Sequence, residues 1–533
     1  MITALVALPA QAPVAAAQLC DSGILPDWTK LWKQPLAITV TTKSPQHGLG
    51  HLIRQPGLVL AVLNFCLGLV WMAVILPLDA PDEPGHLQAI MQVRKQYILP
   101  EIHYAPGNRA GEVIGPPSDA ETRAYIAKLL PKLPVTEQYF TVPYESFHPP
   151  LYYLATGFVT QLVPPDPQTV LYSGRLLAIL FGAATVYFCW LTTRELAPQA
   201  PLWAVAVAGV VALLPEFCFD SAHAANDSAV NLTATVAFYV WIRGLRDPEF
   251  DRRLLGAGAM VGLAFLSKLT AVALIPGLAL VILFRMFQVG PSVLGLGDWL
   301  KRALYMMVGA TLGTLLVCGW WFVRNVFTYG EPTGTAAALR FFARRFVKAD
   351  FTLPRTAGDL LRYTLESLWG RFGWNDITLP QEWYHFCNSA ALFLVCLSVL
   401  AGIGMFALRA TGRRSPDAVT WQAFLVFLVV AVTLFAGYIQ FNKNIGYQPQ
   451  ARYFFILLLP GALLLTGGLY TLAATPALRI VAFGIVFTAL GFLNAFALVT
   501  VSKAGPAPGG VRYSLHTLSH LNTLVSAVEN HSD

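Results

Sequence analysis

The feature that most constrains this chain is an uncharged, apolar run of about 22 residues from Gly57 to Leu78. A helix of that length crosses the hydrocarbon core of a bilayer, because each residue adds about 1.5 Å and the core is about 30 Å thick. Ten further apolar runs follow, and 56% of the 533 residues are hydrophobic while 12% are charged. Since lipid offers the backbone no hydrogen bonds, these runs are expected to be helices. The sequence predicts an all-α polytopic membrane protein with about eleven transmembrane helices.

The charges of the loops predict how these helices are oriented. The first 56 residues carry four basic and two acidic side chains, whereas the segment from Asp79 to His148 carries nine acidic and six basic ones. Because basic loops stay inside, we expect a cytoplasmic N-terminal tail (1–56), a transmembrane domain (57–500) and an extracytoplasmic C-terminal tail (501–533). After the first run, the predicted spans are 171–193, 201–219, 226–242, 254–268, 270–287, 303–323, 388–408, 419–439, 452–472 and 477–500. The run 150–163 is too short to span and is interpreted as interfacial or re-entrant; if it spanned, the basic clusters would lie outside.

Two large outer loops are predicted, 79–149 and 324–387. In the first, apolar residues recur at helical spacing around Ile90 and again around Ile126, which predicts two helices lying along the membrane surface. The second loop carries eight basic and six acidic residues, although loops outside the cytoplasm usually carry few basic residues. Its basic residues 340, 344, 345 and 348 predict a short amphipathic helix, which would either be attracted to lipid head groups or capture a lipid-linked phosphate.

The first outer loop begins with three carboxylates and a histidine: Asp79, Asp82, Glu83 and His86. Pro81 and Pro84 restrict their own backbone angles and those of the residues before them, so Asp82 and Glu83 are expected on a stiff turn. The same stretch would also serve as a polar cap that ends a membrane helix. If a divalent cation binds here, its ligands would be the oxygen and nitrogen atoms of Asp82, Glu83 and His86.

Other polar residues stand at the ends of apolar runs, all on the side of Asp82 in the predicted topology. They are Asn226, Asp227, Lys268, Arg324, Asn325, Arg452 and Tyr453. A charge in a membrane is costly and is commonly functional, although a side chain at a helix end can reach the head groups. Each of these residues alone fits a structural or a functional interpretation. Their gathering on one face favours a function.

Several classes of protein lack support in the sequence. The chain contains no CxxC pair, no GxGxxG sequence and no Walker A sequence, so neither a metal ribbon nor a nucleotide-binding domain is predicted. The net charge of +7 is scattered over short loops, which fits contact with membrane lipids and does not indicate nucleic acid. The small residues of 256–262 are expected to allow close packing of helices.

The order of these motifs resembles the GT-C superfamily of polyprenyl-phosphate-sugar-dependent glycosyltransferases, including bacterial relatives of protein O-mannosyltransferases and the lipid A aminoarabinose transferase. The likeness covers about 57–500. It rests on Asp82-Glu83, Pro149-Pro150-Leu151, Arg175, Asn226-Asp227, Lys268, Trp320-x-x-x-Arg324-Asn325 and Gln450-x-Arg452-Tyr453. The Pro-Asp-Glu-Pro-x-His stretch and Phe372-Gly373-Trp374 are similar to a largely uncharacterised bacterial family within this group.

This resemblance implies a GT-C fold in the bacterial cytoplasmic membrane, with the active site on the extracytoplasmic face. It implies transfer of a sugar, with inversion, from a polyprenyl-phosphate donor to a hydroxyl of a glycan, lipid or protein. Asp82 would be the base, assisted by Glu83 and His86. The residues expected to bind substrate are Asp79, His148, Arg175, Asn226, Asp227, Lys268, Arg324, Asn325, Arg452 and Tyr453, with Arg452 foremost at the phosphate. The alternatives are a transporter or flippase for a lipid-linked sugar or other anion, and a non-catalytic sugar-lipid-binding subunit.

Overall fold

The computed structural model describes residues 55–96, 99, 103–104, 113–114, 119–129, 144–247, 249–336, 354–410 and 417–504. The N-terminal tail through residue 54, residues 505–533 of the C-terminal tail and the basic helix predicted at 340–348 lie outside these ranges.

All eleven predicted apolar segments are helical. They are α4 (Pro56–Val74), α9 (Pro167–Leu196), α10 (Pro201–Leu213) with α11 (Pro215–Asp220), α12 (Asp227–Arg246), α13 (Leu254–Ser267), α14 (Leu274–Gln288), α16 (Leu296–Tyr329), α19 (Gln381–Ala410), α20 (Ala418–Asn444), α21 (Leu458–Leu472) and α22 (Pro476–Ala504). The short helices η5 (Leu269–Ala273) and η6 (Ala451–Leu457) lead into α14 and α21. Within the described ranges, eight helical segments are long and apolar enough to cross a membrane. Because α10 and α13 are shorter and α12 is more polar, the membrane fold is confirmed while the count of eleven spans stays a prediction.

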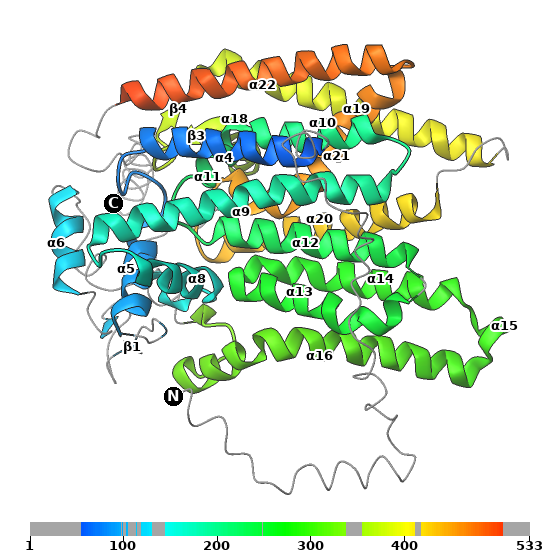
Figure 1. Ribbon diagram of the computed structural model, residues 1–533, viewed down its shortest axis with the longest axis horizontal. Helices are drawn as coiled ribbons and strands as arrows, with labels where there is room; N and C mark the ends of the chain where they lie inside the picture. The colour runs from blue at the N-terminus through cyan, green and yellow to red at the C-terminus, as the bar shows by residue number, and fades with distance from the viewer. Residues whose placement is uncertain are drawn as a thin grey trace, which may run out of the picture. The chain divides into compact units, whose positions relative to one another are not determined.

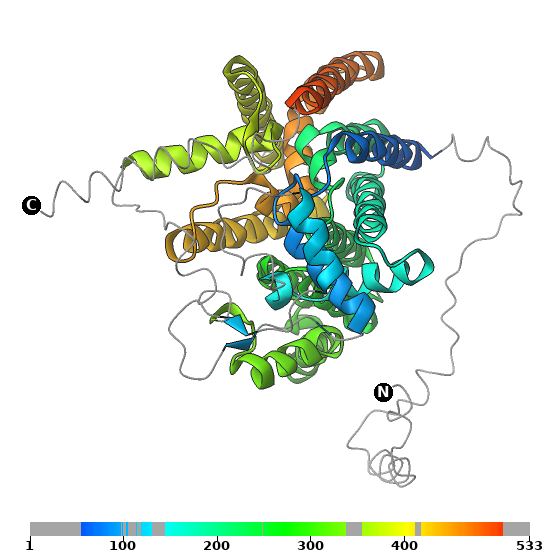
Figure 2. The same cartoon turned by 90° about the vertical axis from the view of Figure 1, so that its left-hand side faces the viewer.

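The long helices lie alongside one another, and the short elements of the first predicted outer loop gather at one end of them (Figure 1). Viewed onto that end, the short helices that follow α4 lie in front of the long ones (Figure 2). They are α5 (Glu83–Gln96), α6 (Ala120–Leu129) and α8 (Leu151–Val159), accompanied by η2 (Tyr144–Phe147), η3 (Thr160–Leu162) and the strand pair β1 (His103–Tyr104) and β2 (Val113–Ile114). Helices are therefore present at both predicted places, as α5 and α6, while their position along the membrane surface stays a prediction; α5 is buried from Glu83 to Arg94. The run 150–163 contains a nine-residue helix, which is too short to cross a bilayer.

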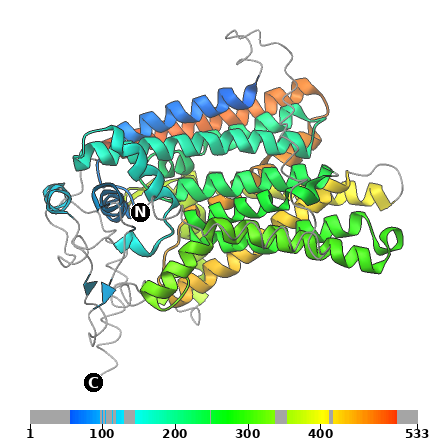
Figure 3. The same ribbon diagram turned by 60° about the horizontal axis from the view of Figure 1, so that its bottom comes forward.

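The remaining elements connect the long helices. They are η4 (Phe250–Arg253), α15 (Pro291–Leu294), α18 (Pro354–Gly370) and the antiparallel pair β3 (Arg371–Phe372) and β4 (Ile377–Thr378). Helix α9 lies beside both α4 and α12, and so connects the side of α4 and α22 with the group that contains α12, α14 and α16 (Figure 3).

Small residues and buried polar side chains hold the helices together. A Cβ atom at Gly258 of α13 would lie 1.9 Å from the carbonyl oxygen of Ala310 in α16, so only glycine allows these backbones to approach. The close packing predicted for 256–262 is thereby confirmed. The buried indole of Trp71 in α4 donates a 2.9 Å hydrogen bond to Asn494 in α22, which satisfies both polar groups inside an apolar core.

The helical backbone is interrupted at two places, and polar residues next to both interruptions interact with Asp227 at the start of α12. Pro215 interrupts the predicted span 201–219, because proline has no N–H and disfavours a helical residue before it; Leu214 is extended there, with ψ at 117°. The second break is at Lys268, where the backbone is extended (φ −160°, ψ 144°) between α13 and η5. The ammonium group of Lys268 thus lies near the start of α12.

Candidate active site

The turn after α4 presents Asp82 in an uncommon backbone conformation. Both Leu78 (φ 66°) and Asp82 (φ 62°) lie in the left-handed region, which aspartate tolerates better than most residues. The carbonyl of Asp82 accepts a 3.0 Å bond from the N–H of His86, so Asp82 directly precedes the first turn of α5. We expected Pro84 to keep Glu83 out of a helix. That expectation was wrong, because Pro84 is the second residue of α5, where a proline ring fits.

The side chain of Asp82 is paired with Arg452 from the opposite part of the chain. Nη2 of Arg452 donates to Oδ2 of Asp82 at 2.8 Å, and Nε donates to Gln450 at 2.6 Å. Arg452 is nearly buried, whereas the side chain of Asp82 is 31% exposed. The carboxylate is therefore the accessible member of the pair.

A second ion pair continues this network. Asp227, the first residue of α12, accepts a 2.6 Å bond from the ammonium group of Lys268. Its other oxygen, Oδ2, lies 3.8 Å from Nη1 of Arg452, and Lys268 lies 5.4 Å from the centre of the Tyr453 ring. The structure thus brings together four of the predicted residues, Asp82, Arg452, Asp227 and Lys268, from widely separated parts of the sequence. Arg452 and Lys268 are each paired with a carboxylate. An anionic ligand could displace that carboxylate and take its place as the partner of the cation.

Glu83 has a different environment from its neighbour. Its fully buried carboxylate accepts two bonds from Arg175 of α9, at 2.8 and 2.7 Å. It also accepts the backbone N–H of Leu78 and that of Ala224, both at 2.9 Å. Because Arg175 also donates to the carbonyls of Ile75 and Leu76, this pair holds the end of α4, the turn and α9 in register. These contacts give Glu83 and Arg175 a positioning role, and the predicted roles of Glu83 in assisting the base and of Arg175 in binding substrate stay predictions.

His86 makes its hydrogen bond with a residue other than Asp82. A 2.9 Å hydrogen bond joins its Nδ1 atom to the hydroxyl of Tyr153 in α8, and the two rings are stacked. Burial lowers the pKa of His86 to about 3, which keeps the ring neutral at ordinary pH. Asp82, Glu83 and His86 therefore have three different partners. Among the described residues, no group of three histidine, cysteine or acidic side chains is arranged to hold a metal ion.

The other predicted residues make their contacts outside the network formed by Asp82, Arg452, Asp227 and Lys268. Asn226 donates to the carbonyl of Ser267 at 3.2 Å and so ties the start of α12 to the end of α13. Arg324 donates to Asn325 and lies 5.0 Å from the ring of Trp321, so this pair is held at the end of α16. His148 pairs with Glu145 at 2.8 Å on the closing side of the loop.

Asp79 and Tyr453 complete the predicted set. The backbone N–H of Asp79 donates to the carbonyl of Leu76 within the turn, at 3.1 Å. The hydroxyl of Tyr453 donates to Gln448.

Two buried residues beside the network were missed by the sequence analysis. Neither carboxylate oxygen of Asp220, nor Nε2 of His223, has a hydrogen-bond partner in the described part of the chain. Asp220 interacts electrostatically with Asp227, Arg452 and Lys268. The signal was present as a polar stretch, 220–223, that precedes Asn226 at the same end. We had treated the preceding residues as one unbroken span.

The Phe372-Gly373-Trp374 stretch of the second outer loop contacts the turn of the first. Its Phe372 ring packs 5.0 Å from Trp71 of α4 and 5.3 Å from Phe219 of α11. The indole N–H of Trp374 donates to the carbonyl of Leu78 at 3.3 Å. The two outer loops are thereby joined next to Asp82.

Part of the chain matches a known family of proteins. Residues 147–321 match the family model described as dolichyl-phosphate-mannose-protein mannosyltransferase. The match contains His148, Arg175, Asp227 and Lys268, and it confirms the resemblance to GT-C membrane glycosyltransferases. No curated protein matches the chain.

Two solved structures are similar to the chain at low sequence identity. One is the oligosaccharyltransferase of Archaeoglobus fulgidus in its apo form (12% identity, TM-score 0.46), and the match covers 84% of this chain and 56% of that one. The other is ArnT from Cupriavidus metallidurans bound to undecaprenyl phosphate (16% identity, TM-score 0.41), with 83% and 73% covered. The chain thus spans little more than half of the length of the archaeal protein.

Proposed function

We propose that this protein transfers a sugar from a polyprenyl-phosphate donor to a hydroxyl group of a cell-envelope acceptor, on the outer face of a bacterial cytoplasmic membrane. The observation that carries the proposal is the Asp82–Arg452 pair, in which a partly exposed carboxylate lies 2.8 Å from a buried guanidinium group. A proton acceptor and a phosphate-binding cation are the two groups that such a transfer needs side by side.

In the proposed reaction, the oxygen of the acceptor hydroxyl attacks the anomeric carbon of the donor. At the same time, the carboxylate of Asp82 accepts the proton of that hydroxyl. The bond between that carbon and the phosphate oxygen breaks, and the phosphate leaves with the electron pair. Arg452 and Lys268 stabilise the charge that develops on the leaving phosphate, in a site less screened than water. Attack from the side opposite the phosphate inverts the anomeric configuration.

The sharpest test is the variant Asp82→Asn. Asparagine keeps the size of the side chain and tolerates the left-handed backbone at this position, so the variant is expected to fold. It removes the proton acceptor, and turnover should fall by roughly two to four orders of magnitude. The assay uses purified protein with a panel of radiolabelled polyprenyl-phosphate sugars and a cell-envelope extract as the source of acceptors.

A matched control is Asp166→Asn. Asp166 accepts the N–H of Thr169 at the start of α9, a role that asparagine fills equally well, so activity should be unchanged. Near-native transfer by Asp82→Asn would assign the base to another carboxylate, with Asp79 the next to test. If the wild-type protein moved labelled lipid across vesicles without transferring its sugar, the transporter alternative would replace this proposal.

A further inference from the structure

The turn between α4 and α5 contains a leucine in a backbone conformation that leucine seldom adopts. Leu78 has φ at 66°, in the left-handed region, four residues before Asp82, which has φ at 62°. In that region the Cβ atom of an L-residue crowds the backbone, so such a conformation persists only where surrounding contacts hold it. The contacts of Leu78 therefore help to determine the shape of the turn that presents Asp82.

Leu78 is held by its side chain and by both of its backbone polar groups. The side chain is completely buried. The backbone N–H donates to the carboxylate of Glu83 at 2.9 Å, within the first outer loop. The carbonyl accepts the indole N–H of Trp374 at 3.3 Å, from a residue 296 positions further along the chain. The conformation of this turn therefore depends in part on the second outer loop.

The β3–β4 hairpin that carries Trp374 is anchored in the apolar core. Phe372 of β3 is completely buried, and its ring packs 5.0 Å from Trp71 of α4 and 5.3 Å from Phe219 of α11. Since Trp71 lies in the last turn of α4, the hairpin contacts both that helix and the turn that follows it.

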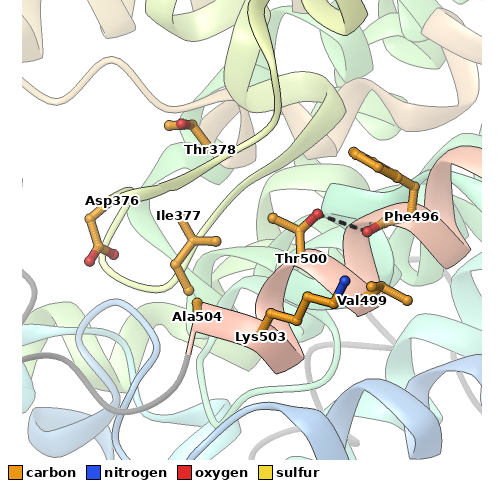
Figure 4. Close-up of a pocket in the computed structure, with 8 residues that line it drawn as sticks. All are labelled: Asp376, Ile377, Thr378, Phe496, Val499, Thr500, Lys503 and Ala504. Atoms are coloured by element: carbon orange, nitrogen blue, oxygen red, sulfur yellow. Dashed lines mark hydrogen bonds between the residues drawn. The ribbon is translucent and has the colours of Figure 1, made fainter.

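The turn of the hairpin is fixed by its own contacts. Gly373 (φ 61°) and Asn375 (φ 68°) reverse the chain on either side of Trp374. The backbone N–H of Trp374 donates to the carboxylate of Asp376 at 3.0 Å, and the guanidinium group of Arg371 donates to the carbonyl of Asn375 at 3.2 Å. Figure 4 shows the side chain of Asp376 on the hairpin side of a cavity of about 520 Å³ whose other wall is α22. Trp374 is thus presented to Leu78 from a defined backbone.

The partner of Asp82 is fixed independently of this turn. Arg452 is nearly buried, and its Nε atom donates to Gln450 at 2.6 Å while Nη2 donates to Asp82 at 2.8 Å. Hydrogen bonds weaken steeply as their geometry departs from the optimum. A change in the turn would therefore move the carboxylate of Asp82 away from a guanidinium group that does not follow it.

We propose that Trp374 is a positioning residue of the candidate site. Its indole N–H holds the carbonyl of Leu78, and this keeps the turn in the conformation that directs the carboxylate of Asp82 toward Arg452. The consequence for sugar transfer rests on the proposed function, whereas the hold on the turn does not.

Hydrogen–deuterium exchange of the purified full-length protein tests the hold without an activity assay. The variant Trp374→Phe keeps an aromatic ring and removes the N–H donor. Within the turn, the backbone amides of Asp79 and His86 donate to carbonyls of the same segment. They should exchange about three- to tenfold faster in the variant, the change expected when one hydrogen bond is lost. Unchanged exchange in peptides covering 76–87 would overturn the proposal, whether or not the protein transfers sugar.

A matched control is Trp299→Phe. The half-buried indole of Trp299 also donates to a backbone carbonyl, that of Met286, at 3.0 Å, where α16 begins. This variant should leave exchange in 76–87 unchanged, and an equal increase there would contradict the assignment. If Trp374→Phe does not fold, replacing Trp374 by benzothienylalanine gives the same comparison. That analogue keeps the shape of tryptophan and has a sulfur atom in place of the N–H group.

Kinetics test whether the hold acts through Asp82. In Trp374→Phe, kcat should fall about tenfold while the KM for the lipid donor changes by less than about twofold, because a displaced base slows turnover more than binding. In protein that already carries Asp82→Asn, the same substitution should cause no further loss, since the carboxylate that it positions is gone. A further loss of about tenfold in that background would overturn the positioning role. Faster exchange in Trp374→Phe together with a wild-type protein that transfers no sugar would contradict the proposed function alone.

Discussion

At the scale of single residues, Arg452 is the centre of the candidate site. Its guanidinium group lies between two carboxylates, 2.8 Å from Asp82 and 3.8 Å from Asp227, and its Nη1 atom has no hydrogen-bond partner in the described part of the chain. A guanidinium group can make two parallel bonds to a phosphate, whereas an ammonium group acts as a point charge. The planar geometry of this side chain is therefore expected to matter beyond its charge.

The variant Arg452→Lys tests this expectation. It keeps the charge and loses the paired donors, so the KM for the lipid donor should rise, or kcat should fall if the contact strengthens as the phosphate leaves. We expect a change of about tenfold or more, since charge-assisted hydrogen bonds contribute about 1.5–3 kcal/mol. Steady-state kinetics over a range of donor concentrations give the measurement, with thermal unfolding as the check on folding. If the lysine variant had the kinetics of the wild-type protein, the role of Arg452 would be structural.

His86 gives a prediction about pH. Its pKa is lowered to about 3 by burial, so between pH 3 and about 6.5 the unfolded chain binds a proton that the folded chain does not. Stability therefore rises with pH across this window and is lost as pH falls through it. Between pH 7 and pH 5 the loss due to this group is roughly 2 kcal/mol.

The measurement compares wild-type protein with His86→Gln, which can still bond to the hydroxyl of Tyr153. Thermal unfolding in detergent at pH 7 and at pH 5 should show a smaller loss of stability in the variant. The same loss in both proteins would mean that His86 is not the group responsible.

The sequence selected the four charged residues of the network, and the structure shows how they pair. Asp82, Asp227, Lys268 and Arg452 were selected because charges at membrane helix ends are costly, and that cost leads them to pair with one another. The pairing itself could not be predicted, because no periodicity encodes which helices are neighbours. Glu83 adjoins Asp82 in the sequence, yet the turn directs the two carboxylates to different partners.

At the scale of elements, the Glu83–Arg175 pair joins four segments. It connects the first turn of α5 with α9, the carbonyls at the end of α4 and the backbone N–H of Ala224 before α12. Both side chains are completely buried, so neither charge can be hydrated if its partner is lost. Together with Arg452, this ion pair therefore helps to fix the relative position of the segments that carry Asp82 and Asp227.

We expect Glu83→Gln to act on stability more than on chemistry. Removing one member of a buried ion pair costs about 3–5 kcal/mol, because it leaves Arg175 buried without a compensating charge. The variant should unfold at a clearly lower temperature than wild type and accumulate poorly in the membrane. The double variant Glu83→Gln with Arg175→Met removes both charges and should recover part of the loss. A variant that kept wild-type stability and lost only turnover would instead place Glu83 in the reaction.

The limits of prediction for elements have a physical origin. Long apolar runs identified the helices because composition alone decides what can cross a membrane. The break at Pro215 was not predicted, and with it the buried Asp220 was overlooked. A proline inside an apolar run is compatible with a kinked continuous helix or with two helices, and neighbouring segments decide between them.

At the scale of the whole transmembrane domain, the charges of the two helix ends differ. The helix α12 begins with Asp227 in the candidate site and ends near Arg243 and Arg246. At that other end, Asp251 binds both Arg285 and Arg302, at 2.9 and 2.7 Å. The end that holds the arginine cluster fits the cytoplasmic side, and the end that holds Asp82 fits the outer side.

This asymmetry makes the topology testable by fusing a reporter that is active only outside the cytoplasm. Fusions near Ala110, near Asp359 and at the C-terminus should be active, because these positions lie in the outer loops and tail of the eleven-span arrangement. Fusions near Asp247 and Thr411 should be inactive, since each falls among arginines that the positive-inside rule retains. Western blots confirm that all five fusions are made in similar amounts. Activity near Asp359 decides the arrangement, because this loop is predicted to be outer despite its excess of basic residues. An inactive fusion there would place the Phe372-Gly373-Trp374 stretch in the cytoplasm. Since Trp374 contacts the turn that carries Asp82, the candidate site would then be cytoplasmic as well, and a donor presented at the outer face could not reach it.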